Sequence, residues 1–167
     1  IDSEFHNKYR FINKHNDIRF IFNNSYEKTI PTIVYLPSSF DVQFDIPTHI
    51  TKLHLGFSFN KYLILNENHI LSYLICGVQF NKPLEINNKL KKLIVGFDFN
   101  SNILVSINTE LEYLVLGCKF NKFIKLPETL KYLEIKSNCQ EIIENLPNQI
   151  EELVFDNIFD LPLNNIP

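Results

Sequence analysis

All four glycines of this 167-residue chain fall in one recurring five-residue phrase, and that repetition limits the fold more than any other feature. The phrases are GFSFN, GVQFN, GFDFN and GCKFN, and they begin at Gly56, Gly77, Gly96 and Gly117. The glycines are 21, 19 and 21 residues apart. A period of this length is typical of a solenoid, in which each repeat forms one coil that stacks on the next.

The repeat extends beyond the glycine phrase. Its core is φ-x-x-φ-x-φ-G-x-x-F-N, where φ is apolar, as in Leu111, Leu114, Leu116, Gly117, Phe120 and Asn121. Two further copies, around Leu133 and Leu153, lack the glycine. A degenerate copy with Val34 and Leu36 precedes the others. The φ-x-φ spacing places two apolar side chains on one face of a short strand, and a repeat of about 20 residues also has room for a turn and an extended or 3₁₀ return.

One coil cannot bury its apolar side chains alone, so the coils must stack. We therefore expect residues 30–167 to form a mainly β, right-handed solenoid of six to seven coils, with a parallel sheet of about seven short strands. The recurrent phenylalanines should stack inside it as a Phe row: Phe40, Phe59, Phe80, Phe99, Phe120 and Phe159. The recurrent asparagines form an Asn row, which we expect to cap backbone groups at the turns rather than to bind a ligand: Asn60, Asn81, Asn100 and Asn121.

Residues 1–29 do not fit the repeat. The spacing of Phe5, Tyr9 and Ile12 favours one face of a short helix, and Arg19–Phe22 favours a short strand. We interpret this segment as an N-terminal cap over the first coil, because the open end of a solenoid exposes apolar surface.

The LxxLxL spacing followed by a polar turn resembles leucine-rich repeats. The recurrent Phe-Asn, above all Phe80-Asn81-Lys82-Pro83, resembles the FNIP repeat of slime moulds and amoeba-infecting giant viruses. In the other repeats Tyr62, Asn102 and Phe123 occupy the proline position. The resemblance covers about residues 30–167 and implies a leucine-rich-repeat-like fold. It also implies an F-box before the repeats, which docks a ubiquitin ligase while the repeats hold the target. Residues 1–29 are too few for an F-box, and the chain starts without methionine, so we expect any F-box upstream.

Composition and motifs argue against several classes of function. The net charge of −3 gives no basic field for nucleic acid. There is no apolar run of about 18 residues, no phosphate-binding glycine loop and no metal-ligand spacing among the histidines, so we expect no membrane span, no cofactor and no metal. Cys76 and Cys139 fall at inward positions, while Cys118 lies in a turn. From the three cysteines we expect an intracellular protein of the cytoplasm, or of the host cytoplasm if the protein is viral. We expect no enzyme; catalysis through Cys118 is the alternative from another class.

The outward strand positions hold the candidate site. The first outer row is Lys52, Tyr73, Lys92, Tyr113, Tyr132 and Glu152, and the second outer row is His54, Ile75, Ile94, Val115, Glu134 and Val154. Together they predict a contiguous apolar and aromatic patch on the open face of the sheet, and such patches mark partner sites. The expected contact residues are Tyr73, Ile75, Lys92, Ile94, Tyr113, Val115, Tyr132 and Glu134. Strand propensity alone, or an N-terminal segment folded over the face, would explain the same residues.

We therefore expect a non-enzymatic module that binds a partner protein through the sheet face. The alternative, implied by the FNIP resemblance, is the substrate-recognition arm of an F-box ubiquitin-ligase adaptor. A structural or oligomeric role is also open, with self-association through the strand edge at Leu153–Phe155.

Overall fold

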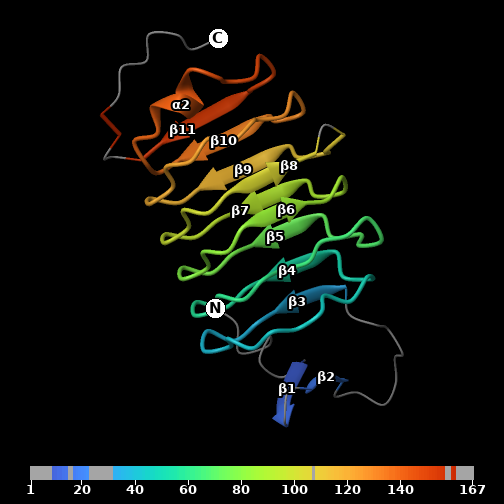
Figure 1. The fold of residues 1–167 in the computed structure, drawn as a ribbon. Helices are drawn as coiled ribbons and strands as arrows, with labels where there is room; N and C mark the ends of the chain where they lie inside the picture. The colour runs from blue at the N-terminus through green and yellow to red at the C-terminus, as the bar shows by residue number, and fades with distance from the viewer. Residues whose placement is uncertain (1–8, 15–16, 23–31, 107, 157–158, 161–167) are drawn as a thin grey trace. The chain divides into compact units, whose positions relative to one another are not determined.

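Seven strands, one from each repeat, pair side by side into a single parallel sheet (Figure 1). The computed structural model describes residues 9–14, 17–22, 32–106, 108–156 and 159–160, in two units that divide at residue 31. Along the sheet the order is β3, β4, β5, β7, β9, β10 and β11. Their bounds are Ile33–Tyr35, Lys52–His54, Tyr73–Ile75, Lys92–Ile94, Tyr113–Leu116, Tyr132–Ile135 and Glu152–Phe155. The expected solenoid with its seven-stranded parallel sheet is thus confirmed.

The N-terminal unit contains an antiparallel pair of strands. Strand β1 (Tyr9–Lys14) pairs with β2 (Asp17–Phe22), with Tyr9 opposite Phe22. The helix predicted through Tyr9 and Ile12 is therefore wrong, while the strand predicted at Arg19–Phe22 is confirmed. Aromatic and β-branched residues in both segments favour strands, and continuous pairing with β2 outweighs a helical spacing of a few residues. Phe5 lies outside the described residues, and the role of this unit as a cap stays a prediction.

The second residue of each strand points inward, and together these residues form the centre of the core. In register these residues are Val34, Leu53, Leu74, Leu93, Leu114, Leu133 and Leu153. All but the last are buried, because each is covered by the coil that holds it and flanked by its neighbours in the sheet.

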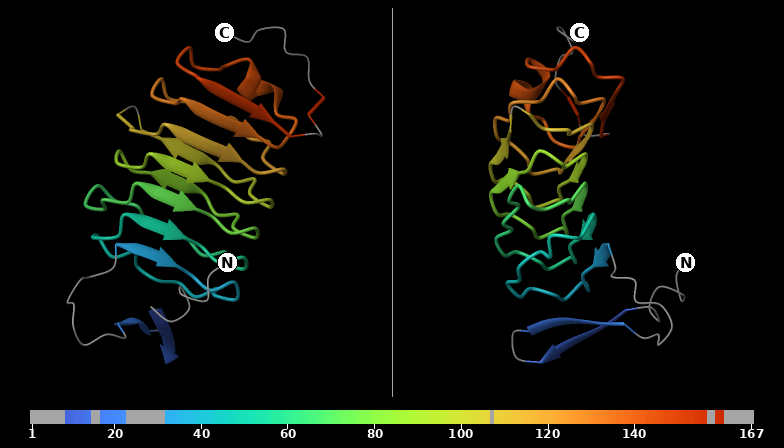
Figure 2. Two further views of the ribbon diagram at one scale, coloured as in Figure 1. Left: turned by 180° about the vertical axis from the view of Figure 1, so that it is seen from behind. Right: turned by 90° about the vertical axis from the view of Figure 1, so that its right-hand side faces the viewer.

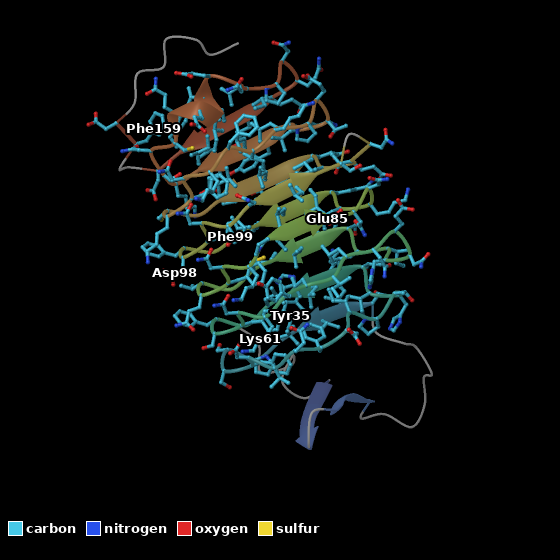
Figure 3. All side chains as sticks on the ribbon, in the orientation of Figure 1. Tyr35, Lys61, Glu85, Asp98, Phe99 and Phe159 are labelled. Carbon is cyan, nitrogen blue, oxygen red and sulfur yellow. The ribbon has the colours of Figure 1, made fainter. Side chains whose placement is uncertain are left out.

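The Phe row forms the second line of the core, as expected. Five rings, from Phe40 to Phe120, stack coil on coil with centroids 5.9 to 6.2 Å apart and planes inclined by 9 to 13°. Phe59 and Phe99 are fully buried. Beyond Phe120 the small Cys139 takes the position of the ring. The prediction that Phe159 belongs to the row is wrong, because its ring packs against Phe155 with the planes tilted by 30°. Figure 3 labels Asp98 at the margin of the turns and Phe99 further inside.

The glycines are required because successive coils approach each other closely at the turn. A Cβ on Gly77 would overlap the carbonyl of Gly56, and the same holds for Gly96 against Gly77 and Gly117 against Gly96. The obstacle is backbone in each case, so it cannot swing aside as a side chain would. Glycine therefore serves close packing between coils.

The Asn row ties each coil to the next one. The backbone N–H of Asn81 donates to Oδ1 of Asn60 at 3.0 Å, and that of Asn100 donates to Oδ1 of Asn81 at 2.9 Å. Asp41 begins the series and accepts from Asn60 at 2.8 Å; Asn121 ends it, donating to Asn100 at 2.9 Å. The structural role is as expected, but the partner lies in the neighbouring coil and not in the residue's own turn.

The return segments run along the opposite side of the solenoid from the main sheet (Figure 2). Two of them form a second, two-stranded parallel sheet, β6 (Leu84–Ile86) with β8 (Ile103–Val105). One short helix, α2 (Gln140–Ile143), follows Cys139. In the described residues the returns contain no 3₁₀ helix. Strands β6 and β8 have the extended form that was predicted, whereas the helix in the return after Cys139 was not predicted.

Candidate partner-binding face

The structure brings the two outer rows together on the outward face of the main sheet. Lys52 pairs with Tyr73, Tyr73 with Lys92, Lys92 with Tyr113, and Tyr113 with Tyr132. The second outer row keeps the same register, from His54 through Ile75, Ile94 and Val115 to Glu134. The predicted alignment of both rows is confirmed, because each repeat places its strand identically against its neighbour.

Side chains of the first outer row are ordered by contacts across the strands. The Nζ of Lys52 lies 4.5 Å from the ring centroid of Tyr73, and that of Lys92 lies 3.6 Å from the centroid of Tyr113. The rings of Tyr113 and Tyr132 stack in parallel with centroids 4.0 Å apart. Ammonium groups over aromatic faces are attracted by the negative charge density of the ring. Each of these contacts favours the observed rotamer of a long side chain.

The second outer row is less exposed than the sequence predicts. Ile75 and Ile94 are half-buried, and Val115 is only 4% exposed. The in-register neighbours of Val115, Ile94 and Glu134, flank it on the face. The expectation that Val115 contacts a partner is therefore wrong, and the continuous exposed apolar patch is reduced to half-buried side chains.

His54 lies at the start of the second outer row. Its ring stacks on that of Tyr35 with centroids 4.2 Å apart. Burial lowers the pKa of His54, and the positive charge of Lys52 lowers it further. The imidazole is therefore held toward its neutral form.

At the C-terminal end of the face the charges are paired. The Tyr132 hydroxyl donates to Glu134 at 3.3 Å, and Lys136 forms an ion pair with Glu134 at 3.1 Å. A hydrogen bond with Tyr113 raises the pKa of Tyr132, and burial and the nearby Glu134 carboxylate raise it further. Tyr132 therefore keeps its proton as a hydrogen-bond donor.

At the other end of the face the charges are unpaired. Among the described residues, neither Lys52 nor Lys92 forms an ion pair. No carboxylate occurs in the outer rows from β4 to β9, whereas Glu134 and Glu152 occur on β10 and β11. The face is thus cationic over β4 to β9 and carries its carboxylates over β10 and β11.

The most exposed large apolar side chains lie elsewhere. Phe57 and Phe97 are each 50% exposed, and both directly follow a glycine. On the return segments Ile64 and Leu104 are 68% and 60% exposed. Our sequence reasoning missed these residues, although a signal was present: the residue after each glycine is Phe, Val, Phe or Cys, which is apolar in a turn that is otherwise polar.

The three cysteines lie as predicted. Cys76 and Cys139 are buried, and burial raises the pKa of both thiols. Cys118 is half-buried in the turn after Gly117. Across the described ranges, no group of three or more His, Cys, Asp or Glu could hold a metal ion. Within the same ranges no helix has the length and apolar character that a membrane crossing requires.

A comparison with models of known protein families found no match, and a comparison with curated proteins found none either.

Proposed function

We propose that this protein is a non-enzymatic module that binds a partner protein through the outward face of its seven-stranded sheet. The observation that carries the proposal is the order of the first outer row, where Lys92, Tyr113 and Tyr132 are stacked one on another. Side chains held in place before binding lose little conformational entropy when a partner docks. Tyrosine also combines a large apolar ring with a polar tip, which is why it is enriched at interfaces.

The expected contact residues are those predicted from the sequence, with one change. Tyr73, Lys92, Tyr113 and Tyr132 provide the ring edges and charges, and Ile75, Ile94 and Glu134 lie beside them. Val115 supports the face from below its surface. A sheet that continues over seven strands offers a long surface, which suits an extended segment of a partner.

Three free thiols support a place inside the cell. Cys76, Cys118 and Cys139 form no disulfide, which fits a reducing compartment such as the cytoplasm. We include this location in the proposal. The adaptor role, in which an upstream F-box recruits a ubiquitin ligase, rests on the resemblance to FNIP repeats and stays a prediction that the full reading frame would test.

The experiment that tests the face is affinity capture with matched variants. Tyr113→Asp and Ile94→Asp place a carboxylate on the sheet face, and Leu104→Asp places one on the return side, where Leu104 is 60% exposed. Proteins captured from cell lysate are quantified for each variant, and circular dichroism confirms the fold. We expect specific partners to be lost with the first two variants and retained with Leu104→Asp. Equal capture by all three would show that this face is not the binding site.

The non-enzymatic part of the proposal needs its own measurement. Cys118 is the accessible candidate nucleophile, and a thiolate with a depressed pKa would react faster than a free cysteine. We expect iodoacetamide to label Cys118 no faster than free cysteine at neutral pH. Much faster labelling would favour a catalytic thiol.

A further inference from the structure

We propose that the segment bound by this face is acidic and adopts the polyproline II conformation, lying along the first outer row and across the strands. This inference rests on the proposed function, since it names the chemistry of the partner for the same face. It is carried by the charge of the row and by the spacing of its residues.

The charge of the face selects an anionic partner. Lys52 and Lys92 have no ion-pair partner among the described residues, and the outer rows of β4 to β9 contain no carboxylate. Glu134 and Glu152 would repel an anion over β10 and β11, although Lys136 offsets the first of them. The acidic segment therefore binds over the part of the sheet from β4 to β9.

The spacing of the row selects the conformation. Lysine and tyrosine alternate from Lys52 through Tyr73 and Lys92 to Tyr113, so like residues are two strands apart. Two steps between neighbouring strands span about 9.6 Å. A polyproline II helix repeats every three residues with a rise of about 3.1 Å each, so residues i and i+3 lie on one side about 9.3 Å apart. A β-strand presents same-side residues about 6.8 Å apart, which falls out of step with the lysines.

The tyrosines of the row offer a second kind of contact. Tyr113 is stacked between Lys92 on one side and Tyr132 on the other, so both ring faces are covered. A partner reaches the hydroxyl edge, where the oxygen that hydrogen-bonds with Tyr132 can also bond outward. A phenolic hydroxyl donates a hydrogen bond, and the backbone carbonyls of a polyproline II segment have no internal partner. Carboxylates every third residue on the lysines, with backbone carbonyls on the tyrosines, would satisfy both kinds of side chain.

A nucleic acid would also carry negative charge, but the protein is a poorer match for it. Binding to a phosphate backbone draws on many basic contacts. The outer rows from β4 to β9 offer only Lys52 and Lys92, neither of which has an ion-pair partner among the described residues, on a chain of net charge −3. We therefore use an oligonucleotide as a competing probe.

The test is fluorescence anisotropy with the full chain and a fluorescein-labelled peptide of five Glu-Pro-Pro repeats. We expect saturable binding that weakens as salt is raised, because the lysines are solvent-exposed enough to be screened. Five repeats of Gln-Pro-Pro remove the charge, alternating Glu-Pro sets the carboxylates every second residue, and five repeats of Glu-Gly-Ser keep the spacing without the stiff helix. Each of these should bind more weakly.

Variants of the lysines test the site. Lys52→Gln and Lys92→Gln should each weaken binding about threefold and the double variant about tenfold, which is the range expected for exposed charge pairs. Lys125→Gln, an exposed lysine of a return segment, is the matched control and should leave binding unchanged.

The inference is overturned if the Glu-Pro-Pro peptide shows no saturable binding. It is also overturned if the Glu-Gly-Ser or Glu-Pro peptide binds as tightly as the Glu-Pro-Pro peptide, or if the Lys52 and Lys92 variants bind that peptide as well as the Lys125→Gln control does. Tighter binding of a 15-nucleotide oligo-dT would overturn it in favour of a nucleic acid. The capture experiment with Tyr113→Asp keeps the proposed function separate. If Tyr113→Asp abolishes capture of a partner but the acidic peptide does not compete with that partner, the face remains a binding site. That result would overturn only the inference that the bound segment is an acidic polyproline II helix.

Discussion

Coils that carry the glycine and coils that lack it close their turns in two different ways. At Gly77, Gly96 and Gly117 the backbone lies against the carbonyl of the preceding coil, closer than a Cβ would permit. Lys136 and Asp156 stand at the same position in the last two coils, and their N–H groups donate to the carbonyls of Leu116 and Ile135 at 3.1 and 3.2 Å.

This difference shows that the glycine belongs to one of two packing solutions. A coil can close by approaching its neighbour so tightly that only glycine fits, or it can add a hydrogen bond to the parallel ladder. The ladder bond involves only backbone, so it accepts lysine or aspartate. The following predictions test how much stability each solution provides.

The largest expected effect is in the Phe row, which runs from the first coil through the four glycine-bearing coils and ends before the fifth repeat at Cys139. Phe99→Ala removes a fully buried ring that stacks on two others, and we expect it to lower the free energy of unfolding by about 3–5 kcal/mol. Cys139→Ala, at the matching position of the fifth coil, should cost about 1 kcal/mol because far less volume is removed. Urea denaturation followed by circular dichroism measures both. Equal losses would show that the two kinds of coil are packed alike.

The glycine itself should come next. Gly96→Ala forces a methyl group against the backbone of Gly77, and we expect a loss of about 2–3 kcal/mol in the free energy of unfolding. Lys136→Ala is the control, because that position already holds a Cβ, and it should cost under about 1 kcal/mol through its surface ion pair. If Gly96→Ala is as stable as Lys136→Ala, the glycine-bearing coils do not depend on the absence of a Cβ, and the proposed difference between the two kinds of coil is wrong.

The Asn row should give a smaller effect. Asn100→Ala leaves the N–H of Asn121 without its acceptor, and we expect a loss of about 1–2 kcal/mol. In the described part of the fifth coil no group donates a hydrogen bond to Oδ1 of Asn121, so Asn121→Ala should stay within about 0.5 kcal/mol of the wild type. Thermal unfolding of both variants would measure the difference. Two equal losses would indicate that these side chains act within their own turns.

The smallest effect should be the pH dependence contributed by His54. Its folded-state pKa lies below the ordinary value of 6.5, so the unfolded chain takes up this proton first as the pH falls. Stability should therefore decline as pH falls through 6.5 toward the folded-state pKa, and should not depend on this group well above 6.5. Solvent screens the effect because His54 is only half-buried. His54→Gln should reduce the difference in stability measured between about pH 7.5 and 5.5. An unchanged difference would assign the pH dependence to other groups.

Most of the fold could be predicted from the sequence because each position of the repeat recurs in several copies, which can be aligned and compared. The register of Tyr73 with Lys92, and the burial of Leu74 and Phe80, follow from aligning the copies. The return segments were harder to predict. Their lengths and apolar spacing vary, so pairing between β6 and β8 appears only when Leu84–Ile86 and Ile103–Val105 meet in neighbouring coils.

The candidate site could be predicted only in part. Alternation along a strand shows which side chains face outward, and it placed both outer rows correctly. It does not show how deeply an outward side chain is buried by its neighbours, which is why Val115 was expected to be exposed. The reason for the glycines was likewise hidden, because it depends on the distance between two coils and not on the turn in which each glycine lies.

Each coil makes the same contacts with its neighbour, and this affects how the gene can change length. Residues 77–95 make up one whole unit, from one glycine to the residue before the next. Removing them would join Cys76 to Gly96 and place Gly96 against the backbone of Gly56. The N–H of Asn100 would then donate to Oδ1 of Asn60, so glycine would still pack on glycine and asparagine would still bond to asparagine. An in-frame deletion or duplication of such a unit shortens or extends the solenoid while it preserves the glycine contacts, the Phe row and the Asn row. The length of the sheet face is therefore a heritable quantity that changes in whole coils.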